Sequence, residues 1–286
     1  MRILLLVILI VSCAEWVRPQ TPAPTLLTEQ NSQRAIALDS ATFVRDPLAV
    51  VTRNNFSQNR RTSIALFGHN MDLLPGENAS AVTVRARDSR SRTYNLSVEF
   101  VGKIPNLDFT QVVAGLPDEL AQAGDVWLSV SLRGQTSNEV LFNIEVQTEP
   151  RRVTVAARKA NNFADAVFSF EFGVNGDSAV QLTLNDWDIQ FGNTPGVDSF
   201  NVSMAGDDCS RIQDMGALDW TDAFQVPVLT AHPVPTIEPE INAIVGHMYV
   251  VHTKDRETNL YALFRVESLQ HGVSVTISWK SVQSPE

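Results

Sequence analysis

The sequence predicts an all-β protein built from a β-sandwich and a second antiparallel all-β domain. Apolar and polar residues alternate with a period of two through most of the chain, and no long segment has the 3.6-residue period of a helix. The chain has 286 residues, which suits two ordinary domains. Its halves also differ in charge: residues 1–150 hold 13 Lys and Arg against 15 Asp and Glu, and residues 151–286 hold 9 against 17.

The N-terminal stretch MRILLLVILIVSCAEW has the form of a secretory signal. Its apolar run, residues 3–11, would be about 13 Å long as a helix, against roughly 30 Å for the hydrocarbon core of a bilayer. The run is therefore predicted to be an h-region and not a membrane span. The next residues, IVSC, resemble a bacterial lipobox, which implies a signal peptide over 1–13 and a lipid on Cys13. Ordinary cleavage after Ala14 is the alternative.

Residues 14–37 follow the signal and contain three prolines among many polar side chains. We expect an extended tether here. A lipid anchor and a tether would place the protein outside the cytoplasm, in the cell envelope or on the outer membrane surface, or in the medium if Cys13 carries no lipid. Cys209 is then the only remaining thiol, so no intrachain disulfide is expected. Its neighbours Asp207 and Asp208 disfavour a thiolate, and we expect an inert cysteine.

Residues 38–148 have the strand spacing of a β-sandwich. The segments VTVRAR, VWLSVSLR and VLFNIEVQ each place alternate apolar side chains, up to Val146, on one inward face. The stretch GLPDELAQAGDVWLSVSLRGQTSNEVLFNI resembles the closing hairpin of Ig-like domains of the IPT/TIG kind, especially those of secreted acidobacterial (Solibacter-type) proteins. The resemblance implies an Ig-like spacer or adhesive module that carries no chemistry.

The net charge of −10 argues against a nucleic-acid partner, which would need a basic face. One local basic run stands out in the first module: Arg85, Arg87, Arg90 and Arg92. A polyanion-binding patch is one interpretation of this run. A solvated hairpin with Asp88 and Glu99 nearby is the favoured one.

Residues 151–286 alternate again, in VFSFEFGV, LYALFRV and VSVTISWK, and are predicted to be all-β. In the segment NDWDIQF, Trp187, Ile189 and Phe191 share the core-facing side of a strand. Asp186 and Asp188 then lie on the outer face, about 7 Å apart at about 3.3 Å per residue. That separation is loose for a shared metal ion, so we expect a solvated pair of carboxylates.

Six segments of this second module, in order, resemble the HmuY family, haem-binding lipoproteins of the bacterial outer surface. They are residues 170–173 (FEFG), 187–191 (WDIQF), 201–206 (NVSMAG), 216–219 (GALD), 249–266 and 276–279 (TISW). The KDRETN turn, residues 254–259, is longer than the short glycine turn of that family. The resemblance implies a ligand-binding domain with haem as its ligand, and the family's haem-ligating residues have no clear counterpart here.

Histidine, alone or with methionine, holds haem iron in many proteins. His247 and His252 would point to opposite faces of one strand, so they cannot share a ligand. His232 lies in the Pro-rich stretch TAHPVPTIEPE, and His252 lies at a strand end beside KDRETN. These two, His232 and His252, are the candidate haem-binding residues, although a plain surface histidine is the simpler interpretation of each. Packing is the expected role of Met204, Met215 and Met248.

The sequence contains no nucleophile elbow, zinc-peptidase, P-loop or dinucleotide-binding motif, so we expect no enzyme. The leading hypothesis is a surface-anchored bacterial lipoprotein whose second module binds a ligand, with haem as the tentative cofactor and the membrane, haem or a surface protein as partners. The alternative is a structural or adhesive surface protein without a small-molecule ligand. A hydrolase on a β scaffold is a third hypothesis and rests only on acidic loops.

Cys13→Ser should release the protein from membranes into the soluble fraction. Lipid chains contribute about 0.8 kcal/mol per buried CH₂ group, and the variant loses all of it. Fractionation followed by immunoblotting measures the change, with Cys209→Ser as the matched control. Unchanged membrane association of Cys13→Ser would contradict the lipobox.

Overall fold

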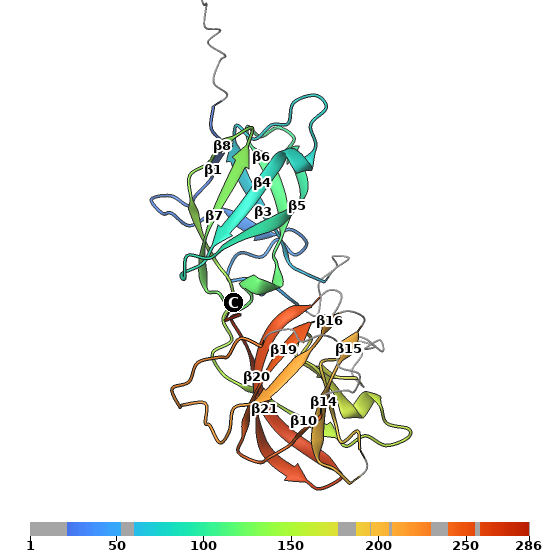
Figure 1. Ribbon diagram of the computed structural model, residues 1–286. Helices are drawn as coiled ribbons and strands as arrows, with labels where there is room; N and C mark the ends of the chain where they lie inside the picture. The colour runs from blue at the N-terminus through green and yellow to red at the C-terminus, as the bar shows by residue number, and fades with distance from the viewer. Residues whose placement is uncertain are drawn as a thin grey trace, which may run out of the picture.

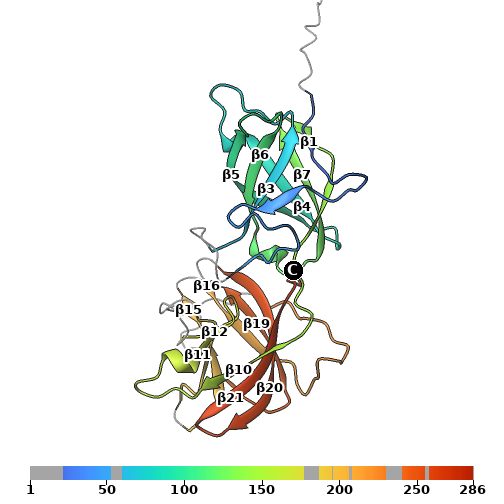
Figure 2. The same ribbon diagram turned by 180° about the vertical axis from the view of Figure 1, so that it is seen from behind.

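The computed structural model is all-β, as the alternation of apolar and polar residues predicts. It describes residues 22–52, 60–176, 187–194, 196–205, 208–229, 240–254 and 258–285. Two modules lie end to end, and the C-terminus lies at the junction between them (Figures 1 and 2). The helical elements of the described residues are three short 3-10 turns: η1 (Ala79–Ala81), η2 (Asp118–Leu120) and η3 (Ala164–Ala166).

The first module is one curled nine-stranded sheet, ordered β1-β3-β6-β5-β4-β7-β8, with β2 beside β3 and β9 beside β7. Strand β5 pairs with β4 along its first half and with β6 along its second, so the sheet folds over a common core. The strands are β1 (Thr25–Leu26), β2 (Ala37–Asp39), β3 (Ser63–His69), β4 (Val82–Arg87), β5 (Thr93–Lys103), β6 (Thr110–Gly115), β7 (Asp125–Leu132), β8 (Gln135–Thr136) and β9 (Val140–Asn143).

The inward faces of the first module are those that the period-two pattern predicts. On β7, Val126, Leu128 and Val130 are fully buried, and the apolar side chains of β4 are buried beside them. Val146 is an exception, because 48% of it is exposed. Strand β9 ends at Asn143, so the alternation that predicted an inward Val146 no longer applies there.

The predicted tether is too long at its C-terminal end. Residues 25–37 belong to the first module: β1 pairs with the end of β3, and β2 pairs with its start. Leu26, Ala35 and Ala37 are at most 3% exposed. Their burial stabilises a segment whose polar composition suggested an extended chain.

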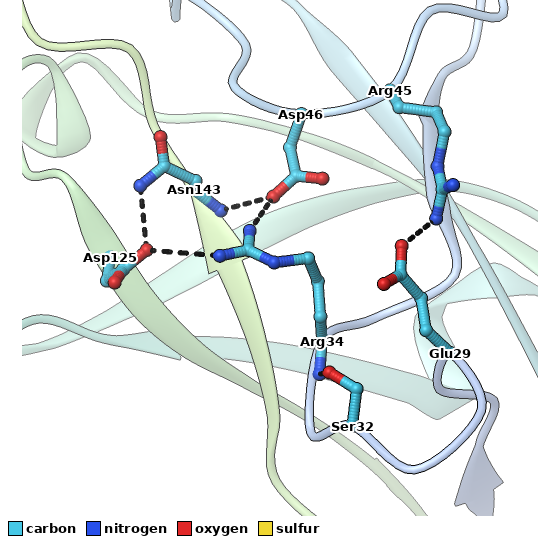
Figure 3. A network of polar contacts seen from close by, with 7 residues as sticks. All are labelled: Glu29, Ser32, Arg34, Arg45, Asp46, Asp125 and Asn143. Carbon is cyan, nitrogen blue, oxygen red and sulfur yellow. Dashed lines mark hydrogen bonds and ion pairs between the residues drawn. The ribbon is translucent and has the colours of Figure 1, made fainter.

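A charged network fastens this N-terminal segment to β7 and β9 (Figure 3). The Arg34 guanidinium pairs with Asp46 and lies 3.9 Å from a carboxylate oxygen of Asp125. Asn143 completes the network: its backbone N–H donates to Asp46 at 2.9 Å, and its side-chain amide donates to Asp125 at 2.7 Å. All the partners in this cluster belong to the first module, and their contacts hold residues 34 and 46 against β7 and β9.

The second module consists of two five-stranded antiparallel sheets and one small ribbon. The sheet orders are β10-β21-β20-β19-β17 and β12-β11-β13-β14-β18, and β15 pairs with β16. The strands are β10 (Arg151–Ala156), β11 (Val167–Ser169), β12 (Val174–Asn175), β13 (Ile189–Phe191), β14 (Ser199–Val202), β15 (Met204–Ala205), β16 (Asp208–Cys209), β17 (Arg211–Asp214), β18 (Glu240–Asn242), β19 (Met248–Lys254), β20 (Asn259–Gln270) and β21 (Ser274–Val282).

Aromatic side chains from both sheets fill the core of the second module. Phe264 of β20 stacks on Tyr249 with ring centroids 5.0 Å apart, and Phe200 of β14 meets Phe264 edge-on at 4.9 Å. Phe170 also stacks on Phe264, and the Trp279 ring lies against Phe170. Such pairs contribute about 0.5–1.5 kcal/mol each beyond the burial of their area.

Strand β19 is buried on both faces. The outer face is covered by residues 216–229, which we call the strap. Its Trp220 donates to the Ser278 hydroxyl at 2.7 Å, and its Leu229 packs against Met248, Val250 and Leu263. The strap gives the module a second, smaller apolar core that the strand pattern alone does not reveal.

The NDWDIQF segment corrects a second expectation. Trp187, Ile189 and Phe191 are buried, as predicted. Asp188 is also buried, at 2% exposed, and its carboxylate accepts the backbone N–H of Phe170 at 2.6 Å. Asp186 lies outside the described residues. Asp188 is therefore a structural acceptor at the turn after β11 and not half of a solvated pair.

Asp188→Ala should lower the free energy of unfolding by about 1–3 kcal/mol, because it leaves the buried Phe170 amide without its acceptor. Chemical denaturation of the full chain measures the change. The exposed residue Glu149 supplies the control, and Glu149→Ala should stay within about 0.5 kcal/mol of wild type. An Asp188→Ala variant as stable as this control would restore the expectation of a solvated carboxylate.

Candidate functional site

Of the two candidate haem-binding residues predicted from the sequence, the structure describes only His252. His232 lies outside the described residues, as does the lipidation candidate Cys13. His252 lies within β19 and is 8% exposed, so it is a buried strand residue and not a side chain at a loop rim. The hydrogen-bond partners of His252 lead directly to the junction of the two modules.

The His252 ring is held on one face and at one nitrogen. It stacks on Tyr261 with ring centroids 4.2 Å apart and an interplanar angle of 17°. Its Nε2 lies 2.7 Å from the side-chain oxygen of Asn259. That oxygen can only accept, so Nε2 carries the proton and donates it. In the neutral ring the lone pair therefore resides on Nδ1.

Asn259, the first residue of β20, connects His252 to the first module. Its backbone N–H donates to the Asp118 carboxylate at 2.7 Å, and its side-chain amide donates to Glu119 at 2.8 Å. Because a carboxylate accepts only, Glu119 determines which end of the Asn259 amide is the donor. The amide oxygen is then directed toward His252. Turn η2 of the first module thus fixes the tautomer of a histidine in the second.

Arg61 forms the centre of the junction, and only 5% of it is exposed. Its guanidinium pairs with Asp118 of the first module and with Glu171 of the second. The second Glu171 oxygen accepts the Thr258 hydroxyl at 2.8 Å. We call Arg61, Asp118 and Glu171 the charge node. Both modules contribute a carboxylate to it, and one cation serves both.

Burial governs the ionisation of the charge node. It raises the pKa of Asp118 and of Glu171 above their ordinary values, although the Arg61 charge acts in the opposite direction. Burial also lowers the pKa of Arg61, but the two carboxylates outweigh this and the net direction is upward. The guanidinium stays charged, and removing it would leave two desolvated carboxylates without the cation they share.

A groove of about 290 Å³ opens beside the charge node. Its walls carry the polar side chains of Asn95, Ser97 and Glu119, together with the backbone of Gly115. Grooves at domain junctions are frequent ligand sites. The polar groups lining this one can exchange hydrogen bonds with a small polar molecule, and Leu116 and Pro117 add apolar surface to its wall.

The C-terminal tail makes a second contact between the modules. The carbonyl of Ser284 accepts from Arg90 at 3.2 Å and from Arg92 at 2.8 Å, and Gln283 donates to Asp88 at 3.1 Å. We call these residues the tail clip. Two arginines of the basic run therefore bind a backbone carbonyl of the same chain, which neither the polyanion patch nor the solvated hairpin anticipated.

Other histidines, methionines and Cys209 take the following positions. His247 and His271 lie beside carboxylates, those of Asp214 at 2.9 Å and Asp198 at 2.6 Å. Met248 is fully buried and Met215 packs against the same small core, as expected for packing residues. Met204 and Cys209 lie in β15 and β16, and the structure does not describe their side chains. Over the described ranges, no three His, Cys, Asp or Glu side chains gather as a metal site would require.

Comparison with known proteins gives no match: no family model matches the chain, and neither a curated protein nor a solved structure does. Among the residues that the structure describes, no helix is long and apolar enough to cross a membrane.

The junction residues are the part of the site that sequence reasoning missed. Arg61, Asp118 and Glu171 are far apart in the chain. Asp118 lies in the segment that resembles an Ig-like hairpin and Glu171 in FEFG, but neither resemblance indicates that they meet. One signal was present: the turn of residues 254–259 is longer than the resemblance predicts. Its last residue, Asn259, contacts the first module, and Thr258 contacts Glu171 of the charge node.

Asp88 in the tail clip should make the stability of the protein depend on pH. Burial acts to raise its pKa, but hydrogen bonds from Arg92 and Tyr94 outweigh burial and hold the pKa below the ordinary value of 3.8. The stabilising contribution of Asp88 is therefore present above the unfolded-state pKa and is lost as the pH falls through the lowered folded-state pKa.

Asp88→Asn should accordingly reduce the free energy of unfolding at pH 7 by about 1–3 kcal/mol, and the deficit should shrink below about pH 4. Urea denaturation at several pH values measures this. The exposed Asp108 serves as control, and Asp108→Asn should match wild type at neutral pH. A deficit that does not change with pH would contradict the assignment of a lowered pKa to Asp88.

Proposed function

We propose that this chain is a bacterial cell-envelope lipoprotein in which the second module is an HmuY-like ligand-binding domain, with haem as the first ligand to test. One observation carries the proposal. Five of the six segments that resemble the HmuY family are far apart in sequence, yet side chains from all five pack into one core, including Phe170, Phe191, Val202, Tyr249 and Trp279. The sixth, residues 216–219, contributes Leu218 to the small core under the strap.

A ligand of this module would bind at a rim and not in its interior. The aromatic core is filled by rings in mutual contact, with centroid separations between 4.9 and 5.8 Å among Phe170, Phe200, Tyr249 and Phe264. Haem is wide and flat, so it would need an edge where loops meet. This favours His232, in the Pro-rich stretch, as the principal ligand. His252 could offer Nε2 only by giving up its bond to Asn259.

The alternative is a structural or adhesive surface protein without a small-molecule ligand. The filled cores and the charged contacts between the modules favour it, because they suit a stiff spacer as well as a binding protein. The same spectroscopic measurement separates the two functions.

Titration of the full chain with haemin should produce a Soret band that shifts at micromolar concentration. His232→Ala should weaken binding by about tenfold or more, which corresponds to about 1.4 kcal/mol, because an imidazole is the strongest neutral axial donor here. His252→Ala should have a smaller effect. His69 is an exposed histidine at the end of β3, so His69→Ala is the matched control. A wild-type protein without any spectral change would leave the structural or adhesive function.

A further inference from the structure

Contacts between the two modules occur at three separate places among the residues that the structure describes. The first is the charge node of Arg61, Asp118 and Glu171. The second is the tail clip, where the last described residues of the chain bind the turn between β4 and β5. The third is a hydrogen bond from the Gln147 side chain to the carbonyl of Trp279, at 3.3 Å. Three separate contacts restrict how the two modules can move relative to one another.

The charge node extends into the second module along a continuous series of contacts. Asp118 and Glu119 hold Asn259, which accepts from the His252 ring. The His252 ring stacks on Tyr261, and the Tyr261 hydroxyl accepts the backbone N–H of Leu229 at 3.2 Å. Leu229 belongs to the strap. The series therefore runs from turn η2 of the first module to the cover over the outer sheet of the second.

The first residues of the strap are bonded to the sheet by the carbonyls of Gly216 and Leu218, which accept from Met248 and Arg265. The rest of the strap depends on this series more than a strand would. Within residues 220–229, the described backbone hydrogen bond to the sheet runs from the Leu229 N–H to the Tyr261 hydroxyl. The other described contacts of this segment with the sheet come from side chains such as Trp220 and Phe224. Segments with few backbone hydrogen bonds open locally at low free energy. A shift of Tyr261 therefore acts first on the strap.

We propose that the junction is a lock. While the charge node is intact, it fixes the modules as one body, holds His252 in the Nε2–H tautomer and keeps the strap closed; when the modules separate, the His252 ring and the strap are released together. The inference concerns the chain's own conformational states, and it stands whether or not the second module binds a ligand. Its chemical basis is that desolvated carboxylates need the cation they share, so the node is either complete or strongly unfavourable.

Residue-resolved hydrogen exchange of the full chain tests the lock. The Asn259 amide reports on the junction because it donates to Asp118, the Leu229 amide reports on the strap, and the Ala262 amide, inside β20, reports on the fold of the second module. In Arg61→Met, exchange at Asn259 should be on the order of 100-fold faster, with Leu229 also faster and Ala262 unchanged.

Arg34→Met is the matched control. Arg34 has the same type of ion pair, with Asp46, but wholly inside the first module (Figure 3). It should leave Asn259 and Leu229 exchange at the wild-type rate. Wild-type exchange at Asn259 in Arg61→Met would overturn the lock, and so would faster exchange at Asn259 without any change at Leu229.

A second variant keeps the inference testable if Arg61→Met fails to fold, which faster exchange at Ala262 would reveal. Asn259→Ala leaves the charge node in place and removes the link to His252. Nitrogen-15 chemical shifts of the ring should show the Nε2–H tautomer alone in wild type and a mixture of both tautomers in Asn259→Ala, with faster Leu229 exchange. A ring that keeps one tautomer in this variant would overturn the proposed series.

Discussion

The guanidinium of Arg61 is the group on which the arrangement of the two modules depends. It is buried between a carboxylate of the first module, Asp118, and one of the second, Glu171. The loss of this cation would leave two largely desolvated carboxylates without the charge that compensates them. A contact of this kind contributes little net stability compared with an apolar interface, but removing one partner is costly. It therefore restricts how the two modules can be oriented.

The same constraint links parts of the protein that have different predicted roles. His252 is a candidate ligand residue in the sequence, and the structure places it within a series of contacts that begins at Glu119. Its Nε2 proton is committed to Asn259, so ligand chemistry at this histidine competes with the contact between the modules. The basic run of the first module also suggested a binding patch, but its Arg90 and Arg92 donate to the C-terminal tail of the same chain. In both cases a residue type typical of binding serves the chain's own assembly.

Much of the fold follows from local pattern. The alternation in VWLSVSLR identified the inward face of β7, and the aromatic positions of β13 and β21 were predicted to be buried because strand geometry places alternate residues on one face. Asp188 was mistaken for a solvated residue because alternation treats the second face as wet. The turn after β11 covers Asp188, as the strap covers the outer face of β19 in the other sheet, and a period of two carries no information about such covers.

The sequence by itself determined the all-β class and the core residues of most strands, because residues two positions apart lie on the same face of a strand. Only the tertiary structure decided which partners the charged and polar residues contact. Arg61 pairs with Glu171, Asn259 donates to Glu119, and residues 25–37 join the first sheet instead of forming a tether. These contacts join positions more than 30 residues apart in most cases. Their energies depend on burial, and burial is a property of the folded chain.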